Sequence, residues 1–293
     1  MVYTEIAGTY CGFMFRNAEQ REKYLGKRKS VPRRSLRNRN RIQSVQRAIA
    51  ILEAFDLDTP TWGVTSLGAH LNLPKTIVTR LLATLEDAGF VEQDARDHTF
   101  SLGRSVYELA GRYASRNELI RIGNTNLAQL VSRTNFTAQL AVQDGKELVC
   151  LAVCESPMVV RAVFYPGLRR PCHATASGKV LLSGLSDDSI RALYSSDKLT
   201  RITANTIVDI EELLQHIILV RRQGYATNYG ESIDGLIAIA APVRNYQGEI
   251  IAAVSLGFPE QFVSEPQITE LTQYVVKTAQ QISQQLGTYD RFR

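Results

Sequence analysis

The sequence predicts an α+β chain with two folded domains behind a basic tail, and three observations support that prediction. Three short helical patterns and two short β-prone segments follow one another in residues 42–104. Strand patterns joined by turn signals, with helical patterns around them, dominate residues 119–293. The chain has 293 residues, 44% of them hydrophobic, which is enough to bury two cores of ordinary size.

The first 41 residues differ from the rest of the chain in charge. They contain 11 Lys and Arg against 3 Asp and Glu, a net charge of +8, whereas the other 252 residues carry 23 against 26, a net charge of −3. Lys27–Arg41 alone holds eight basic residues and no acidic one. We expect residues 1–41 to be a disordered tail that binds an anionic partner, nucleic acid being the first candidate. A solvated tail without a partner is the alternative.

Residues 42–104 have the pattern of a helix–turn–helix. We expect a first helix from a cap at Ser44 to Phe55, and a second helix over Ser66–Leu71. A tight turn at Asn72–Leu73 then leads into a third helix over Pro74–Ala88, since proline is tolerated in a first helical turn.

The third predicted helix has one apolar side and one polar side. Its apolar stripe consists of Val78, Leu81, Leu82 and Leu85. The opposite face carries Lys75, Thr76, Thr79 and Arg80. These groups can bond the phosphates and base edges of DNA, so this face is a candidate DNA reader. The solvated face of an ordinary amphipathic helix is the alternative.

Two β-prone runs, Phe90–Gln93 and Thr99–Leu102, predict a hairpin or wing after the third helix. Arg96 near its tip could reach a phosphate or a minor groove, or it could pair with Asp94 or Asp97. Residues 42–104 carry five basic and eight acidic groups. A module with this balance binds DNA weakly through charge alone, so we expect the tail to supply much of the affinity that does not depend on sequence.

These motifs resemble the winged helix–turn–helix of IclR-type bacterial transcription regulators. The resemblance rests on Gln43–Phe55, Leu73–Glu86, Gly89–Val91 and Leu102–Gly103, and it continues to about Gly287. It implies a cytoplasmic homodimer or homotetramer that binds a double-stranded DNA operator, as a repressor or alternatively as an activator. It also adds Arg47 and Ser66 to the expected DNA contacts. Ile77 stands where the family often has Thr, and it could touch a thymine methyl group or pack inward.

The rest of the chain predicts a connecting helix over residues 105–118 and an effector-binding domain over residues 119–293. We expect strands at Thr137–Val142, Glu147–Ala152, Val159–Tyr165, Gly235–Arg244 and Glu249–Leu256. We expect helices at Leu119–Val131, Thr175–Leu182, Ile210–Arg222 and from Ser264 to Leu286. Asp144-Gly145 is a hairpin signal because glycine tolerates a positive φ.

Two segments of this domain, Pro171–Leu182 and Gly224–Leu256, resemble the GAF-like effector domain of the same family. In the family they border a pocket for a small organic acid or an aromatic metabolite. The resemblance implies that Ala176 and Ser177 offer backbone amides to a carboxylate at a helix start. It places the opposite wall of the pocket at Asn228, Leu236, Ala238 and Ser255.

Two departures from the family pattern predict a larger effector. Members that bind very small keto acids tend to have Asp at position 228 and Cys at position 238, where this chain has Asn228 and Ala238. We therefore expect an aromatic or hydroxylated acid, with Arg161, Asn228, Tyr229 or Ser255 as polar anchors. For Arg161 and Tyr229, a surface role is the alternative.

Catalytic, metal and membrane signals are weak in the sequence. No Gly-x-Gly dinucleotide fingerprint occurs. Cys150 and Cys154 lie four residues apart, and in an extended strand that separation is about 13 Å, which is too far to share one metal ion. We expect reduced thiols, no cofactor, no metal, no transmembrane helix and no secretion signal. An enzyme that uses Cys172 or His173, and a general nucleic-acid binder that acts through its tail, are the competing hypotheses.

Overall fold

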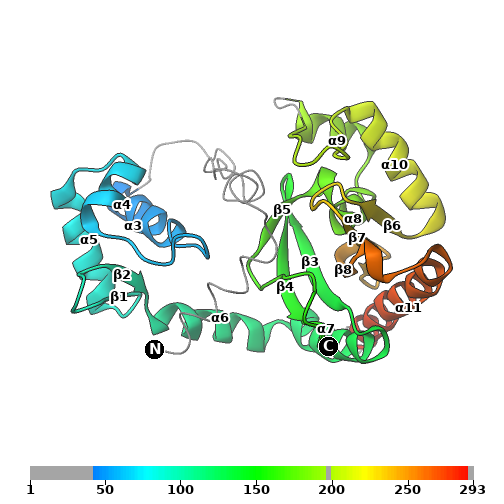
Figure 1. Ribbon diagram of the computed structural model, residues 1–293, viewed down its shortest axis with the longest axis horizontal. Coiled ribbons are helices and arrows are strands. Elements are labelled where there is room, and N and C mark those ends of the chain that lie inside the picture. The colour runs from blue at the N-terminus through cyan, green and yellow to red at the C-terminus, as the bar shows by residue number, and fades with distance from the viewer. Residues whose placement is uncertain (1–41, 196–198, 290–293) are drawn as a thin grey trace. The chain divides into compact units, whose positions relative to one another are not determined.

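The computed structural model describes residues 42–195 and 199–289, and these form two compact units that divide between Asn117 and Glu118 (Figure 1). The basic tail, and with it the expectation of disorder and of an anionic partner, lies outside the described residues.

Within residues 42–117, the first unit contains four helices and one hairpin. They are α3 (Gln43–Glu53), α4 (Val64–Leu71), α5 (Lys75–Asp87), β1 (Val91–Gln93), β2 (Phe100–Leu102) and α6 (Arg104–Arg116). Its core is built by the apolar sides of the three helices and the hairpin, and the residues with no exposed surface are Ile51, Leu67, Val78, Leu82 and Val91.

The first helix begins earlier than the sequence indicates. Ile42 occupies the N-cap of α3 without any side-chain cap, and its carbonyl accepts a hydrogen bond from the backbone N–H of Gln46. Ser44 therefore lies inside the first turn, and the predicted serine cap is wrong. A helix can begin on its backbone hydrogen bonds alone where water can satisfy the free N–H groups.

The turn between α4 and α5 is tight. Asn72 adopts the left-handed conformation at φ 53°, which asparagine tolerates better than most residues. The N–H of Leu73 then donates to the carbonyl of Gly68 at 2.8 Å, and Pro74 stands at the N-cap of α5. The hairpin is joined to this arrangement by Trp62, which exchanges two backbone hydrogen bonds with Phe100.

The second unit is built on a six-stranded antiparallel sheet with the order β5-β4-β3-β8-β7-β6. The strands are β3 (Thr137–Asp144), β4 (Glu147–Cys154), β5 (Arg169–Pro171), β6 (Ala226–Tyr229), β7 (Leu236–Arg244) and β8 (Ile250–Pro259). The helices are α7 (Glu118–Thr134), α8 (Ala176–Leu182), α9 (Asp187–Tyr194), α10 (Ile210–Gln223) and α11 (Glu265–Tyr289), with short 3-10 turns η1 (Cys172–Ala174) and η2 (Glu260–Phe262).

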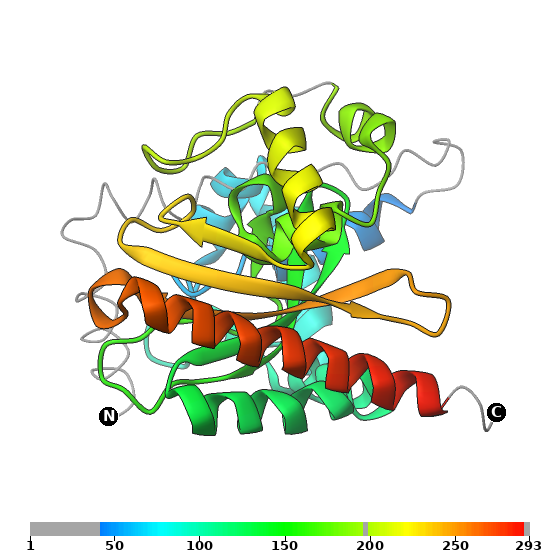
Figure 2. The ribbon, with the colours of Figure 1, turned by 90° about the vertical axis from the view of Figure 1, so that its right-hand side faces the viewer.

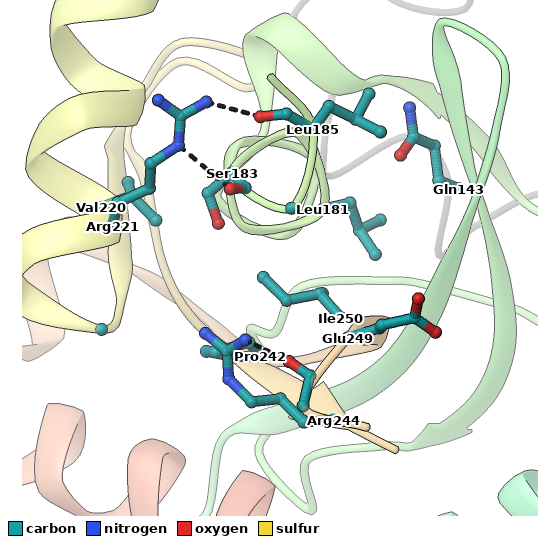
Figure 3. A pocket seen from close by; sticks show the side chains of 13 residues that line it. Gln143, Leu181, Ser183, Leu185, Val220, Arg221, Pro242, Arg244, Glu249 and Ile250 are labelled. Atoms are coloured by element: carbon teal, nitrogen blue, oxygen red, sulfur yellow. Dashed lines mark hydrogen bonds between the residues drawn. The ribbon is translucent and has the colours of Figure 1, made fainter. Parts of the chain in front are cut away.

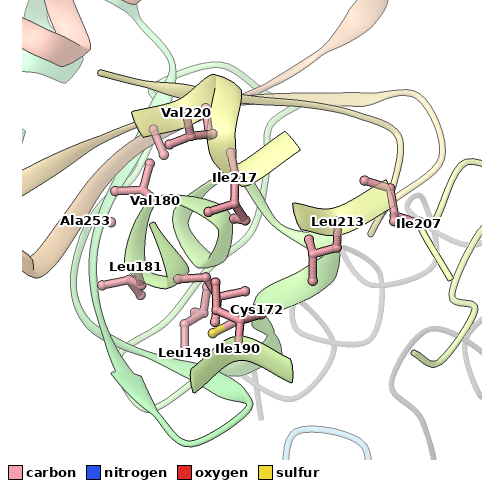
Figure 4. Packing of buried hydrophobic residues seen from close by; sticks show 14 of the residues in the cluster. Leu148, Cys172, Val180, Leu181, Ile190, Ile207, Leu213, Ile217, Val220 and Ala253 are labelled. Atoms are coloured by element: carbon pink, nitrogen blue, oxygen red, sulfur yellow. The ribbon is translucent and has the colours of Figure 1, made fainter. Parts of the chain in front are cut away.

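Helices cover both faces of this sheet. Figure 2 shows α7 and α11 lying side by side on one face, with α8, α9 and α10 on the other. The main core fills the space between α8, α10 and the sheet (Figure 4), where Val180, Ile217 and Ala253 have no exposed surface.

The segment Val159–Tyr165 is not a strand, which corrects the sequence prediction. Its burial does alternate, since Ala162 and Phe164 are buried whereas Val163 is exposed. It forms no ladder because residues 167–171 pair with β4 at this edge, where the N–H of Cys150 donates to the carbonyl of Leu168. An alternating pattern reports which side chains are buried, not whether the backbone finds a partner.

Candidate DNA-reading surface and effector site

The polar face of α5 is solvent-exposed in the structure. Its side chains Lys75, Thr76, Thr79 and Arg80 are all exposed. Val78 and Leu82 on the other side have no exposed surface, and they fix the helix against α3 and α4. Neither Lys75 nor Arg80 has an acidic partner within salt-bridge distance among the described residues, so both positive charges are available to an anion.

Two further residues of α5 have defined surroundings. The hydroxyl of Thr79 donates to the carbonyl of Lys75 at 2.9 Å, which leaves its oxygen lone pairs free to accept. Ile77 is half-buried and lies outside the hydrophobic cluster of this unit. Part of the Ile77 side chain, at the edge of the polar face, is thus available for apolar contact.

The other predicted DNA contacts come from three different elements. Arg47 on α3 is half-buried, and Ser66 in the first turn of α4 is exposed and donates to the carbonyl of Gly63 at 3.0 Å. Arg96 lies in the turn of the wing. Its backbone N–H donates to Asp94 Oδ1 at 2.7 Å.

The predicted alternative for Arg96, an ion pair with Asp94 or Asp97, is not formed in the structure. Asp97 instead accepts hydrogen bonds from the backbone N–H and the hydroxyl of Thr99, at 2.8 and 2.7 Å. These hydrogen bonds hold the pKa of the Asp97 carboxyl below its usual value. The guanidinium of Arg96 therefore projects from the wing without a carboxylate partner among the described residues.

In the second unit, Ser177 on α8 and Ser255 on β8 are both buried and lie in direct contact. The hydroxyl of Ser177 donates to Ser255 Oγ at 2.9 Å. Ser255 stands opposite Gln139 of β3 and opposite Ala240 of β7 in the sheet. The structure thus joins two of the predicted effector residues, and it adds a third polar side chain, Gln139, which sequence reasoning missed.

Asn228 on β6 is buried, and both ends of its amide are occupied. Its Nδ2 donates to the carbonyl of Ala174 at 2.6 Å, and its Oδ1 accepts from the backbone N–H of Glu231 at 3.0 Å. Asn228 therefore ties the η1 turn to the loop after β6. As an anchor for a ligand it would first have to release one of these bonds.

The carboxylate of Glu231 forms a buried ion pair with Lys179 of α8. Lys179 Nζ lies 2.5 Å from Glu231 Oε1, and the side chain of Lys179 is 1% exposed. Burial lowers the pKa of Lys179 and raises that of Glu231, while their attraction opposes both shifts. The backbone carbonyl of Glu231 also accepts hydrogen bonds from the hydroxyls of Thr203 and Thr206. The sequence signal for this pair is a lysine within the otherwise apolar run of α8.

The helix start at Ala176 and Ser177 is weaker as an anion site than the sequence suggests. α8 has only seven residues, and the dipole of so short a helix is small. Thr175 caps it, since its hydroxyl oxygen accepts from the backbone N–H of Gly178 at 3.1 Å.

The remaining predicted effector residues occupy varied surroundings. Leu236 packs in an apolar cluster with Phe164 and Leu168, and Ala238 is half-buried against the main core. The side chain of Tyr229 is exposed. The guanidinium of Arg161 pairs with Glu155 at 3.0 Å, and its buried Nε has no hydrogen-bond partner. No contact between Arg161 or Tyr229 and the Ser177–Ser255 pair is present.

A separate hollow of about 370 Å³ lies between α8, α10 and the β7–β8 connection (Figure 3). None of the predicted effector residues lines it. Arg221 at its edge donates to the carbonyls of Ser183 and Leu185 and pairs with Asp187, so its charge is already neutralised.

Cys150, Cys172 and His173 are buried, as structural residues are. Burial raises the pKa of Cys150 to about 12 and also raises the pKa of Cys172, which keeps both as inert thiols. His173 Nε2 donates to the carbonyl of Thr200 at 3.0 Å, and burial lowers its pKa. Within residues 42–195 and 199–289, no group of three or more His, Cys, Asp or Glu side chains could hold a metal ion. In the same ranges no helix combines the length and the apolarity that crossing a membrane requires.

A winged helix–turn–helix followed by a domain with a central curled sheet defines the class of DNA-binding transcription regulators. Residues 44–95 match the IclR helix-turn-helix domain, and residues 111–284 match the family described as bacterial transcriptional regulator IclR C-terminal. The chain belongs to the IclR family of bacterial transcriptional regulators. This confirms the resemblance and the fold class, and it assigns the chain to a non-enzymatic family.

Individual relatives agree with this assignment. The transcriptional regulator KdgR of Dickeya chrysanthemi is 32% identical over 249 residues, which cover 85% of this chain and 81% of that protein. The transcriptional repressor AllR of Escherichia coli K12 is 28% identical over 245 residues, 84% of this chain and 90% of that protein.

Solved structures show the same architecture. An IclR transcriptional regulator from Alicyclobacillus acidocaldarius has a TM-score of 0.77 at 26% identity, covering 83% of this chain and 98% of that chain. An IclR homologue from Microbacterium hydrocarbonoxydans, solved in complex with 4-hydroxybenzoate, has a TM-score of 0.74 at 25% identity, covering 83% and 99%.

Proposed function

We propose that this regulator represses transcription as a cytoplasmic homodimer or homotetramer that reads an operator with α5 and responds to a small organic acid. The observation that carries the DNA-reading part is the exposed face of α5, where Lys75 and Arg80 have no acidic partner among the described residues. Repression is favoured because curated relatives include the AllR repressors. Activation by the same fold is the alternative.

Each predicted DNA contact then has a chemical role. The guanidinium of Arg80 can donate two hydrogen bonds to a guanine edge, and the hydroxyls of Thr76 and Thr79 can bond bases or phosphates. Ile77 offers its methyl groups to thymine. The remaining predicted contacts are to the DNA backbone or to a minor groove. They come from Lys75, Arg47, Ser66 and Arg96.

Two exposed apolar surfaces support the proposed self-association. On α3, the side chains of Ile42, Val45 and Ile49 are exposed at a spacing that places them along one face. On α6, no residue is buried, and Tyr107 is 82% exposed. Burying such surfaces between two copies would pair two DNA readers for the two halves of a symmetric operator.

Effector control requires two arrangements that the ligand binds unequally. An acid that prefers one arrangement of the second unit would shift the population toward it, and the shift would change the spacing of the paired readers. The proposed contacts are the backbone of Ala176, the hydroxyls of Ser177 and Ser255, and the walls at Asn228, Leu236 and Ala238. The outer anchors Arg161 and Tyr229 remain part of this proposal.

Arg80→Ala tests the DNA-reading role. Binding is measured by fluorescence anisotropy on the fragment upstream of the protein's own gene and on a scrambled duplex. We expect a loss of about 1 to 3 kcal/mol on the first and a much smaller loss on the second. Arg133→Ala removes the same charge from the other unit and should change neither value. An equal loss on both duplexes would make Arg80 a phosphate contact and contradict base reading.

A further inference from the structure

We propose that Gln139 makes the effector site selective for acids that also carry a hydroxyl group. The inference rests on the proposed effector role of the Ser177–Ser255 region and specifies the class of ligand that this region takes.

The strand register places Gln139 on the sheet face that α8 covers. Gln139 of β3 stands directly opposite Ser255 of β8, and directly opposed residues of neighbouring strands project to the same face. Ser255 contacts Ser177 of α8 on that face. Gln139 therefore shares this face of the sheet with the serine pair.

The chain segment after β4, with Ala162 and Phe164, borders the region around Gln139 and Ser255 on the side away from α8. Gly257, two residues along β8 from Ser255, projects to the same face, and a Cβ atom built there would lie 3.0 Å from the ring of Phe164 and 3.3 Å from Ala162. Thr137, opposite Gly257, donates its hydroxyl to the carbonyl of Ala162 at 2.8 Å. A ligand over Gln139 and Ser255 would thus lie between α8 and residues 162–164.

The polar groups on this face differ in whether they are already hydrogen-bonded. Ser177 and Ser255 bond each other, and both ends of the Asn228 amide are occupied. The side chain of Gln139 is only 8% exposed, and its buried Oε1 has no hydrogen-bond partner. A buried amide oxygen without a hydrogen-bond partner is costly in free energy, so such groups are rare unless a ligand or a water molecule completes them.

The chemistry of the amide defines its partner. An amide presents one acceptor oxygen and two N–H donors, and a hydroxyl group can serve either end because it both donates and accepts. A carboxylate can only accept, so it cannot satisfy Oε1. An acid without a hydroxyl group would leave Gln139 Oε1 unpaired, and a site built to bond a hydroxyl rejects analogues that lack one.

The test compares acids that differ only in the hydroxyl group. Calorimetry on the full-length protein uses two pairs of probes, 4-hydroxybenzoate with benzoate and 3-hydroxybutyrate with butyrate. In at least one pair we expect the hydroxylated acid to bind at least about tenfold more tightly. In Gln139→Leu and in Gln139→Met this preference should fall to about twofold or less, while the deoxy acid binds as well as before.

Gln143→Leu is the matched control, because Gln143 lies on the same strand but lines the separate hollow instead. It should keep the preference. Circular dichroism and operator binding check that each variant is folded, and the methionine variant keeps the unbranched shape if leucine does not fit.

The results that would contradict the role of Gln139 differ from those that would contradict acid sensing itself. Equal binding within both pairs, or a preference that survives both Gln139 variants, would overturn the role of Gln139 and leave acid sensing intact. Operator binding without affinity for any of the four acids would overturn this inference and the proposed response to small acids together.

Discussion

Lys179 is among the largest side chains with less than 2% exposure in the described residues, and its charge is compensated by one carboxylate. Burying two charges costs free energy that their mutual attraction only about offsets. Such a pair therefore fixes the relative position of its two side chains more than it stabilises the fold. Here the arrangement is the position of residues 228–231 relative to α8, because the N–H of Glu231 also orients the amide of Asn228.

Lys179→Met leaves the carboxylate of Glu231 buried without its partner, and we expect a destabilisation of about 3 to 5 kcal/mol in urea unfolding. Lys277→Met, at an exposed position of α11, should cost less than about 0.5 kcal/mol. In Lys179→Met/Glu231→Leu, stability should recover above that of Lys179→Met. A double variant whose loss equals the sum of the two single losses would show that the two charges are not coupled.

At the residue scale, the sequence predicts which faces are polar but not which groups are already bonded. The spacing of Lys75, Thr76, Thr79 and Arg80 was sufficient to predict their common exposed face. Asn228 is hydrogen-bonded to Ala174 and Glu231, and its bond to Ala174 joins residues that are 54 positions apart in the sequence. Contacts of that range are decided by tertiary packing, and no local pattern reports them.

At the scale of elements, long periodic segments were predictable, whereas only some of the short ones were. The predicted helix over Ile210–Arg222 corresponds to α10, and the predicted strand over Gly235–Arg244 corresponds to β7. The three-residue strand β5, the four-residue strand β6 and the eight-residue helix α9 were missed. These three segments span too few periods to be recognised by periodicity alone, and pairing with a neighbouring strand creates β5 and β6.

The contact between η1 and α8 gives a prediction at this scale. A Cβ atom on Gly178 would overlap backbone atoms of Cys172, and backbone cannot move aside as a flexible side chain can. Gly178→Ala should therefore destabilise the second unit by about 2 to 3 kcal/mol or more. Gly111→Ala is the control in α6, where a Cβ atom meets nothing within 4 Å, and we expect a gain of about 0.5 to 1 kcal/mol from helix propensity.

Two probes separate these effects. Trp62 is the single tryptophan of the chain and lies in the first unit, so its fluorescence reports that unit, whereas far-ultraviolet circular dichroism reports both. Gly178→Ala should lower the circular dichroism midpoint and leave the fluorescence midpoint unchanged. A Gly178→Ala protein as stable as the parent by both probes would contradict the close approach of η1 and α8.

At the scale of the whole molecule, the groups that can read bases and the net positive charge lie in different parts of the chain. The α5 face carries the groups that can distinguish bases, yet residues 42–104 hold five basic against eight acidic residues. Attraction to DNA through charge alone must therefore be weak in this unit. Residues 1–41, with 11 basic and 3 acidic residues, hold the counterbalancing charge.

Deleting residues 1–41 tests this division. Each phosphate that a basic side chain neutralises adds about 0.9 to the slope of the logarithm of the binding constant against that of salt concentration. We expect the truncated protein to bind more weakly with a shallower slope, while it keeps its preference for the upstream fragment over scrambled DNA. The preference should survive because the side chains that read bases remain on α5.

A full-length variant in which the eight basic residues of Lys27–Arg41 become glutamine is the control for chain length, and it should show the same shallower slope. An unchanged slope in both proteins would mean that the tail does not touch phosphates. Loss of all binding on truncation would instead favour a general nucleic-acid binder that acts through its tail. The two measurements therefore separate affinity from specificity, which the sequence assigns to different segments of the chain.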